Sequence, residues 1–309
     1  MIIRRLLAAL LLMSVLVSCS GGEDTKISAS TPSSTPTSAA MSNPTSSAST
    51  QSSADDCPPT TASAPAIDES NPIPYASYHY VAVISMRLES RSAADSGPVL
   101  EMLGEVGGDY VAPDRHIFTN TFSGESALLG LPSESGSNEV IAIGDDAWFR
   151  EFEQAKPTAD ERALEPWSER RIPDLIADGT ATFSSLDLDV HGWVGVPEDG
   201  DIPPGALVGT ELRNCVETIH YKLDKSVVTG LPFVVGLSDA EEFTYHMWVD
   251  SQTGVVVAFD VSVITSAQAF LGAPPPELGV SADTQLVMDV FFYITRINDP
   301  SIAVQAPAQ

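Results

Sequence analysis

Hydrophobic and polar side chains alternate along much of the chain after residue 75. From Tyr78 to Leu88 every second position is apolar, and His79, Ser85 and Arg87 lie between these positions. Successive side chains of a β-strand point to opposite faces of its sheet, so this segment is predicted to be a strand with one wetter face. Six more segments are predicted strands: Arg115–Phe122, Glu139–Arg150, Val216–Leu223, Phe243–Val249, Val255–Ile264 and Leu286–Ile297.

Turn residues separate these segments. The clearest turn is Asp250-Ser251-Gln252-Thr253-Gly254, which joins two predicted strands and ends on a glycine suited to a positive φ. Most of the predicted strands follow one another without a crossover helix between them. Parallel strands need such crossovers, so the sequence predicts a mainly β (α+β) fold with an antiparallel sheet.

Two short helices are expected between the strands. The segment Thr158–Leu164 begins with a capping residue and an acidic first turn, and Ser168–Ala177 is a second candidate. Proline interrupts both neighbourhoods, which excludes one long helix. Weaker helical candidates are Asp95–Leu103 and Ser266–Leu271.

The N-terminal segment has the features of an export signal. Arg4-Arg5 precede the apolar stretch Leu6–Met13, which is too short to span a bilayer, and Leu16-Val17-Ser18-Cys19 follows. This arrangement resembles the bacterial lipoprotein signal, in which the cysteine receives a diacylglyceryl group and the chain is cut before it. The resemblance implies that residues 1–18 are a signal peptide and that Cys19 anchors an exterior protein to the cell membrane.

Two regions are predicted after the cysteine. Residues 19–70 are rich in Ser, Thr, Pro and Ala and contain few large apolar side chains. Such a segment cannot bury enough surface to offset its conformational entropy, so a disordered stalk is expected. Residues 71–309 have the length of one domain and contain all of the predicted strands.

The charge of the chain narrows its partners. The sequence has 42 acidic and 15 basic residues and a formal net charge of −27. Residues 71–309 hold 36 of the acids and 12 of the bases, a formal charge of −24. A surface of this sign repels phosphate backbones, so nucleic-acid binding is not expected. The acids are scattered and indicate a soluble exterior rather than a dedicated cation site.

The two remaining cysteines leave alternatives open. If Cys19 is acylated, Cys57 and Cys215 form an even pair in an oxidising compartment, where a disulfide is a natural expectation. The bridge would join the end of the stalk to the folded domain. The alternative is a free Cys57 and a buried Cys215, because the sequence shows neither their distance nor their geometry.

The sequence contains no recognisable catalytic motif. Its five histidines lie on separate predicted segments without the spacing of metal ligands: His79, His116, His191, His220 and His246. His220 and His246 would approach each other only if their strands pair. We therefore expect a protein that is not an enzyme and has no metal or other cofactor.

The order of several motifs resembles the LolA/LppX-like family of lipoprotein and lipid carriers. The motifs are Tyr110–Arg115, Glu139–Arg150 with a turn at Gly144-Asp145, Gly209–Asp224, Met247–Gly254 and Tyr293–Pro300, and they span about residues 75–307. The resemblance implies a strongly curved antiparallel sheet, or half-barrel, with a few short helices on its concave side.

The resemblance also implies a ligand, namely a lipid or another acylated hydrophobic molecule bound in an apolar cavity. Candidate lining residues are the apolar positions of the strands: Ile84, Met86, Leu88, Phe118, Phe122, Met247, Val257, Phe259, Met288 and Phe292. Plain core packing of the same side chains is the competing interpretation. In that case the chain would be a non-enzymatic interaction or structural lipoprotein of the envelope, with a fully packed sheet and an unidentified protein partner.

Overall fold

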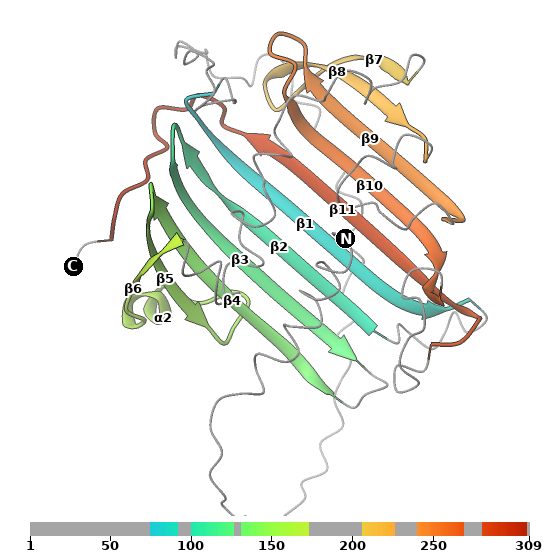
Figure 1. Ribbon diagram of the computed structural model, residues 1–309, viewed down its shortest axis with the longest axis horizontal. Helices are drawn as coiled ribbons and strands as arrows, with labels where there is room; N and C mark the ends of the chain where they lie inside the picture. Colours follow the sequence, from blue (N-terminus) through green and yellow to red (C-terminus); the bar gives the residue numbers. More distant parts are fainter. Residues whose placement is uncertain are drawn as a thin grey trace, which may run out of the picture.

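One large antiparallel sheet dominates the molecule. The computed structural model describes residues 75–91, 100–126, 131–172, 206–225, 240–268 and 280–307. Within these ranges eleven strands pair in the order β6-β5-β4-β3-β2-β1-β11-β10-β9-β8-β7 (Figure 1). Neighbours in this order are also neighbours in the chain, except that β1 pairs with β11. This single long-range pair joins the N-terminal half of the sheet to the C-terminal half.

The strands have the following bounds: β1 Ser77–Ser90, β2 Leu100–Val111, β3 Arg115–Ser126, β4 Leu131–Ile143, β5 Asp146–Phe152, β6 Ser168–Arg171, β7 Leu207–Arg213, β8 Val216–Leu223, β9 Glu242–Asp250, β10 Val256–Ser266 and β11 Thr284–Thr295. All seven predicted segments fall on strands, and Glu139–Arg150 proves to be a hairpin of β4 and β5. The expected turn lies at its centre, where Gly144 has a φ of +57°.

Three strands were not predicted from the alternation, and two helical expectations are wrong. Residues 100–103 of the candidate Asp95–Leu103 belong to β2, and Ser168–Arg171 form β6. In β2 the glycines 104, 107 and 108 supply no side chain to the pattern, so pairing with β1 and β3 decides its conformation. The candidate Ser266–Leu271 starts at the last residue of β10 and continues beyond the described residues.

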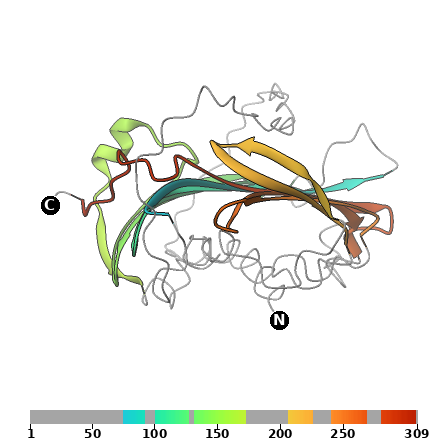
Figure 2. The ribbon, with the colours of Figure 1, turned by 90° about the horizontal axis from the view of Figure 1, so that it is seen from above.

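The helix expected at Thr158–Leu164 is present as α2, Ala159–Leu164. The Thr158 hydroxyl accepts a hydrogen bond from the Glu161 backbone N–H, and the Glu161 carboxylate accepts one from the Thr158 N–H. This reciprocal capping box stabilises a helix that buries none of its own residues. Helices were expected on the concave side of the sheet, but α2, the described helix, lies on the opposite side (Figure 2).

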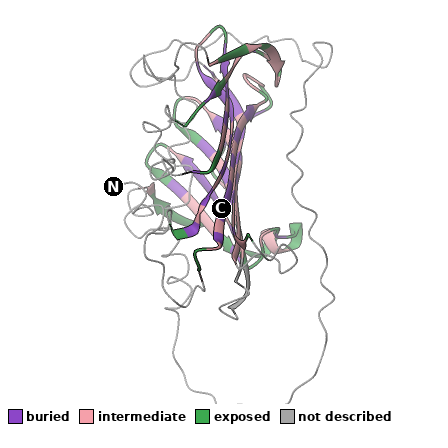
Figure 3. Cartoon of the chain, turned by 90° about the vertical axis from the view of Figure 1, so that its right-hand side faces the viewer, coloured by how far each residue is buried: buried purple, intermediate pink, exposed green. Residues whose placement is uncertain are grey.

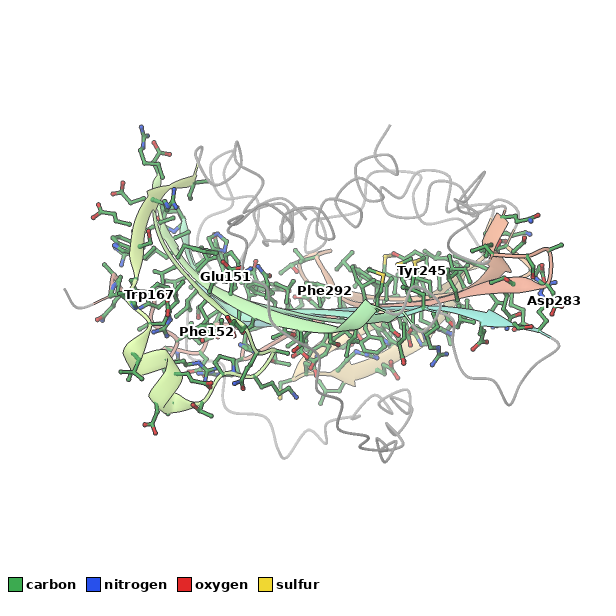
Figure 4. All side chains as sticks on the ribbon, turned by 90° about the horizontal axis from the view of Figure 1, so that it is seen from below. Glu151, Phe152, Trp167, Tyr245, Asp283 and Phe292 are labelled. Atoms are coloured by element: carbon green, nitrogen blue, oxygen red, sulfur yellow. The ribbon has the colours of Figure 1, made fainter. Side chains whose placement is uncertain are left out.

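The two faces of the sheet differ in composition. Paired residues of antiparallel strands share a face, so the register assigns Tyr80, Ile294, Phe292, Phe259 and Met247 to one side. Figure 4 shows Tyr245 and Phe292 on the side toward which the sheet curves, and Phe152 and Trp167 on the other. We call these the concave and convex faces. The convex face carries polar residues such as His79, Asp109 and Glu139 at the alternate positions.

The main hydrophobic core lies on the concave face. Its members come from strands at both ends of the sheet and include Val106, Phe118, Tyr245 and Val261. Buried positions alternate with less buried ones along the central strands, whereas α2 is largely exposed (Figure 3). The period-two pattern in the sequence therefore becomes a continuous apolar layer through strand pairing.

The N-terminal predictions lie outside the described residues. These are the signal peptide 1–18, the acylated Cys19 and the stalk through residue 70. No helix in the described ranges is long and apolar enough to cross a membrane.

Candidate functional site

The candidate lining residues meet on the concave face. Phe292 pairs with Ala82 of β1 and with Phe259 of β10, which in turn pairs with Met247 of β9. The Phe259 and Phe292 rings stack at a centroid distance of 5.4 Å. The row therefore places three candidates side by side, although their positions in the sequence differ by as much as 45 residues.

The other candidates extend this layer along β1 and outward. Met86 pairs with Met288, and Leu88, which belongs to a smaller cluster with Leu286, also contacts Met86. Ile84 packs against the main core, as Phe118 and Val257 do from β3 and from the bulge between Val256 and Ala258. Phe122 pairs through its backbone with Gly104, and its side chain is outside the described part of the structure.

A cluster of tyrosines at one end of this face was missed at the sequence level. The rings of Tyr78 and Tyr110 lie 4.9 Å apart, and the Tyr75 ring packs edge-on against Tyr78. The Tyr75 hydroxyl donates a 2.6 Å hydrogen bond to Asp250, at the β9–β10 turn. Burial raises the pKa of Tyr110 to about 12, with a smaller contribution from the Asp114 carboxylate. The tyrosines are thus neutral amphipathic side chains at neutral pH.

A cavity of about 420 Å³ opens where β8 ends and β9 continues. It is lined by Lys222, Leu223, Asp224, Lys225, Ala240, Glu241 and Phe243. The Lys225 ammonium donates a 2.9 Å hydrogen bond to the Ala240 carbonyl across the cavity. Leu223 belongs to the concave core and Phe243 packs against it, so the apolar wall of the cavity continues the concave face.

The convex face carries a compact polar cluster around Trp248 of β9. His220 Nε2 lies 2.8 Å from His246 Nδ1, and the His220 ring stacks on the indole at 4.5 Å. The indole N–H donates to the Glu211 carboxylate, and the Arg213 guanidinium lies 3.6 Å from the ring centroid. The paired strands β7, β8 and β9 thus supply one residue layer, and only the two histidines had been considered from the sequence.

Burial dominates the electrostatics of this cluster. It lowers the pKa of both imidazoles, because an imidazolium loses hydration there, although Glu211 and Asp260 oppose the shift. Burial also raises the pKa of Asp260 and lowers that of Arg213. The histidine pair is therefore neutral at pH 7. In the described ranges no group of three or more His, Cys, Asp and Glu residues is arranged to hold a metal ion.

A second cavity, of about 480 Å³, lies on the convex face beside α2. Trp148, Trp167 and Pro307 are among its lining residues. Beneath it the buried Glu139 carboxylate binds Arg150 and Arg162, and the Arg150 guanidinium lies 4.2 Å from the Trp167 ring centroid. This network attaches α2 to the sheet and explains why the helix lies on the convex side.

Cys215 is disulfide-bonded in the structure, and its partner is outside the described residues. The sequence has three cysteines, so the partner is Cys19 or Cys57. Cys215 occupies the two-residue turn between β7 and β8, where Asn214 and Cys215 have φ values of +50° and +67°. Asn214 Nδ2 donates a 2.9 Å hydrogen bond to the Ile294 carbonyl, which ties this turn to β11.

Comparisons with known proteins do not assign the chain, since no protein-family model and no curated protein sequence matches it.

Proposed function

We propose that this chain is a membrane-anchored exterior protein that binds lipid or another acylated hydrophobic ligand against the concave face of its sheet. The observation that carries the proposal is the unbroken apolar layer from β5 to β8. It runs from Phe149 through Phe118 and Tyr80 to the central strands, and then through Phe259 and Met247. In this proposal the curved sheet acts as a LolA/LppX-like half-barrel.

Hydrophobic burial would supply the affinity. An acyl chain gains about 0.8 kcal/mol for each methylene group removed from water, so affinity rises with chain length. Phe, Met and Val side chains provide a surface without polar requirements, and the methionines adapt to chains of different shape. Binding of this kind requires no metal, cofactor or catalytic group.

Acylated Cys19 would hold the domain near the membrane at the end of a stalk. Its sulfur would be consumed by the acyl linkage, which leaves Cys57 as the disulfide partner of Cys215. The bridge would tie the end of the stalk to the turn between β7 and β8. Cleavage before Cys19 and acylation are both testable by mass spectrometry of the N-terminal peptide.

The decisive experiment is mass spectrometry of organic-solvent extracts. The chain carrying Cys19→Ala, which cannot be acylated, is purified without detergent beside an unrelated acidic protein. Stoichiometric lipid in the extract of this protein alone is the expected result and identifies the ligand class. A clean extract, together with no uptake of a fluorescent fatty acid, would refute the proposal.

A second candidate is a non-enzymatic interaction module with a fully packed sheet. Two observations favour it. Phe292 and Val261 are fully buried on the concave face, and the edge strand β7 exposes 61% of Leu207 and 57% of Val208. An exposed edge can accept a strand from a partner through backbone hydrogen bonds. This candidate predicts a lipid-free protein whose partner binding is lost when Val208 is replaced by proline.

A further inference from the structure

The cavity at the end of β8 combines an apolar wall with an ammonium group. Leu223 is the last residue of β8 and is 4% exposed, and Phe243 lies beyond the end of that strand. The cross-strand partners of Leu223 and Phe243 are Tyr245 and Val263, both in the concave core. A chain bound along the concave face would therefore reach solvent at this cavity.

The charges around the cavity differ from those of the rest of the domain. Lys222 and Lys225 line it, and neither forms an ion pair with a carboxylate in the described ranges. The Glu241 carboxylate is already paired with Arg91. Lys225 spends one N–H on the Ala240 carbonyl, which leaves two of its three donors for a ligand.

This positive group stands in a strongly acidic domain. Residues 71–309 carry a formal charge of −24, and the sequence has four lysines in all, two of which line this cavity. A volume of about 420 Å³ is also within the usual range of ligand pockets, roughly 300–1,000 Å³. A negatively charged ligand that approaches the domain gains its attraction here, where the lysine charges are not cancelled by a paired carboxylate.

We propose that this cavity binds the anionic head group of an acyl-chain ligand, a carboxylate or a phosphate, through the Lys225 ammonium. Leu223 and Phe243 would contact the first methylenes of the chain. The inference rests on the proposed lipid-binding function and adds a selectivity to it. Neutral lipids of equal chain length would lack the charge-assisted hydrogen bond and bind more weakly.

Titrations with four ligands of one chain length test the proposal. Palmitate and palmitoyl lysophosphatidic acid are anionic, whereas palmitoyl lysophosphatidylcholine and monopalmitoylglycerol carry no net charge. The Cys19→Ala chain is used below the critical micelle concentration of each ligand. We expect the two anionic ligands to bind about tenfold more tightly, and added salt to weaken only their binding.

Lys225→Gln should remove this preference and leave the affinity for monopalmitoylglycerol unchanged, whereas Lys225→Arg should retain most of it. Lys156→Gln is the matched control, because Lys156 is also an exposed lysine but does not line the cavity. Acetate and inorganic phosphate distinguish a free-anion site: saturable binding without an acyl chain would overturn the proposal.

The outcomes separate this inference from the function on which it rests. Equal affinity for all four ligands, or a preference that survives in Lys225→Gln, would overturn the head-group site and leave lipid binding intact. Failure to bind any of the four would overturn both. A thermal melt of each variant beside the parent chain confirms that a lost preference is not lost folding.

Discussion

His220 Nε2 and His246 Nδ1 lie 2.8 Å apart across the β8–β9 pair. At this distance one imidazole donates the hydrogen bond and the other accepts it, so at least one ring is neutral. Five other polar or aromatic side chains surround the pair, namely Glu211 and Arg213 of β7, Lys222 of β8, Trp248 of β9 and Asp260 of β10. The pair thus joins the edge hairpin to the rest of the sheet.

The first prediction concerns pH. The unfolded chain binds protons at these histidines near pH 6.5, whereas the folded chain does so only at lower pH, because burial depresses both pKa values. The stability contributed by the neutral pair is therefore complete above pH 6.5 and is lost as the pH falls below it. Urea denaturation from pH 7.5 to pH 5 should show this decline.

The control for that prediction is the double variant His220→Gln/His246→Gln, which should decline less steeply over the same range. Parallel curves for the parent chain and the double variant would contradict it. The depressed pKa of Asp299, about 2, does not interfere, because that carboxylate titrates below this window.

The second prediction compares two glycines on the same face of β2. A Cβ at Gly108 would stand 2.2 Å from the Ile117 carbonyl oxygen, whereas one at Gly104 has no neighbouring atom within 4 Å. Gly108→Ala should lower the free energy of unfolding by about 1 to 3 kcal/mol. Gly104→Ala should leave it unchanged or raise it by up to about 1 kcal/mol. Equal effects in chemical denaturation would be the contrary result.

The third prediction concerns the attachment of α2. Glu139 is 8% exposed and binds both Arg150 and Arg162. Glu139→Ala should cost about 3 kcal/mol of stability, because it leaves a guanidinium buried without its counter-charge. Asp145→Ala is the control, since its pair with Arg171 is largely exposed and should contribute less than about 1 kcal/mol. The pair of variants is compared by urea denaturation.

The fourth prediction concerns the turn that carries Cys215. Asn214 adopts a φ of +50° and donates to the Ile294 carbonyl. Asn214→Ala should cost about 1 to 2 kcal/mol, since it loses the hydrogen bond and places a less suitable residue in the left-handed region. Asn214→Gly keeps the backbone preference and should cost less. A smaller loss in the alanine variant than in the glycine variant would contradict the assignment.

The sequence alone determined which side chains share a face. Alternation is a local property of extended backbone, so Ile84, Met86 and Leu88 were assigned correctly to one apolar side before their partners were known. The turn at Gly254 and the capped helix after Thr158 are local in the same sense. In each case the signal and the structure it specifies lie within a few residues.

Only the tertiary structure decided the partners of each strand and what gathers on the convex face. Gly104, Gly107 and Gly108 hid β2 from the alternation, and it becomes a strand because β1 and β3 pair with both of its edges. The pairing of β7 with β8 brings Glu211 and Arg213 to Trp248, and Glu139 draws α2 to the convex side. These contacts depend on strand register and on residues distant in the chain, and no local pattern records which strand will be the neighbour.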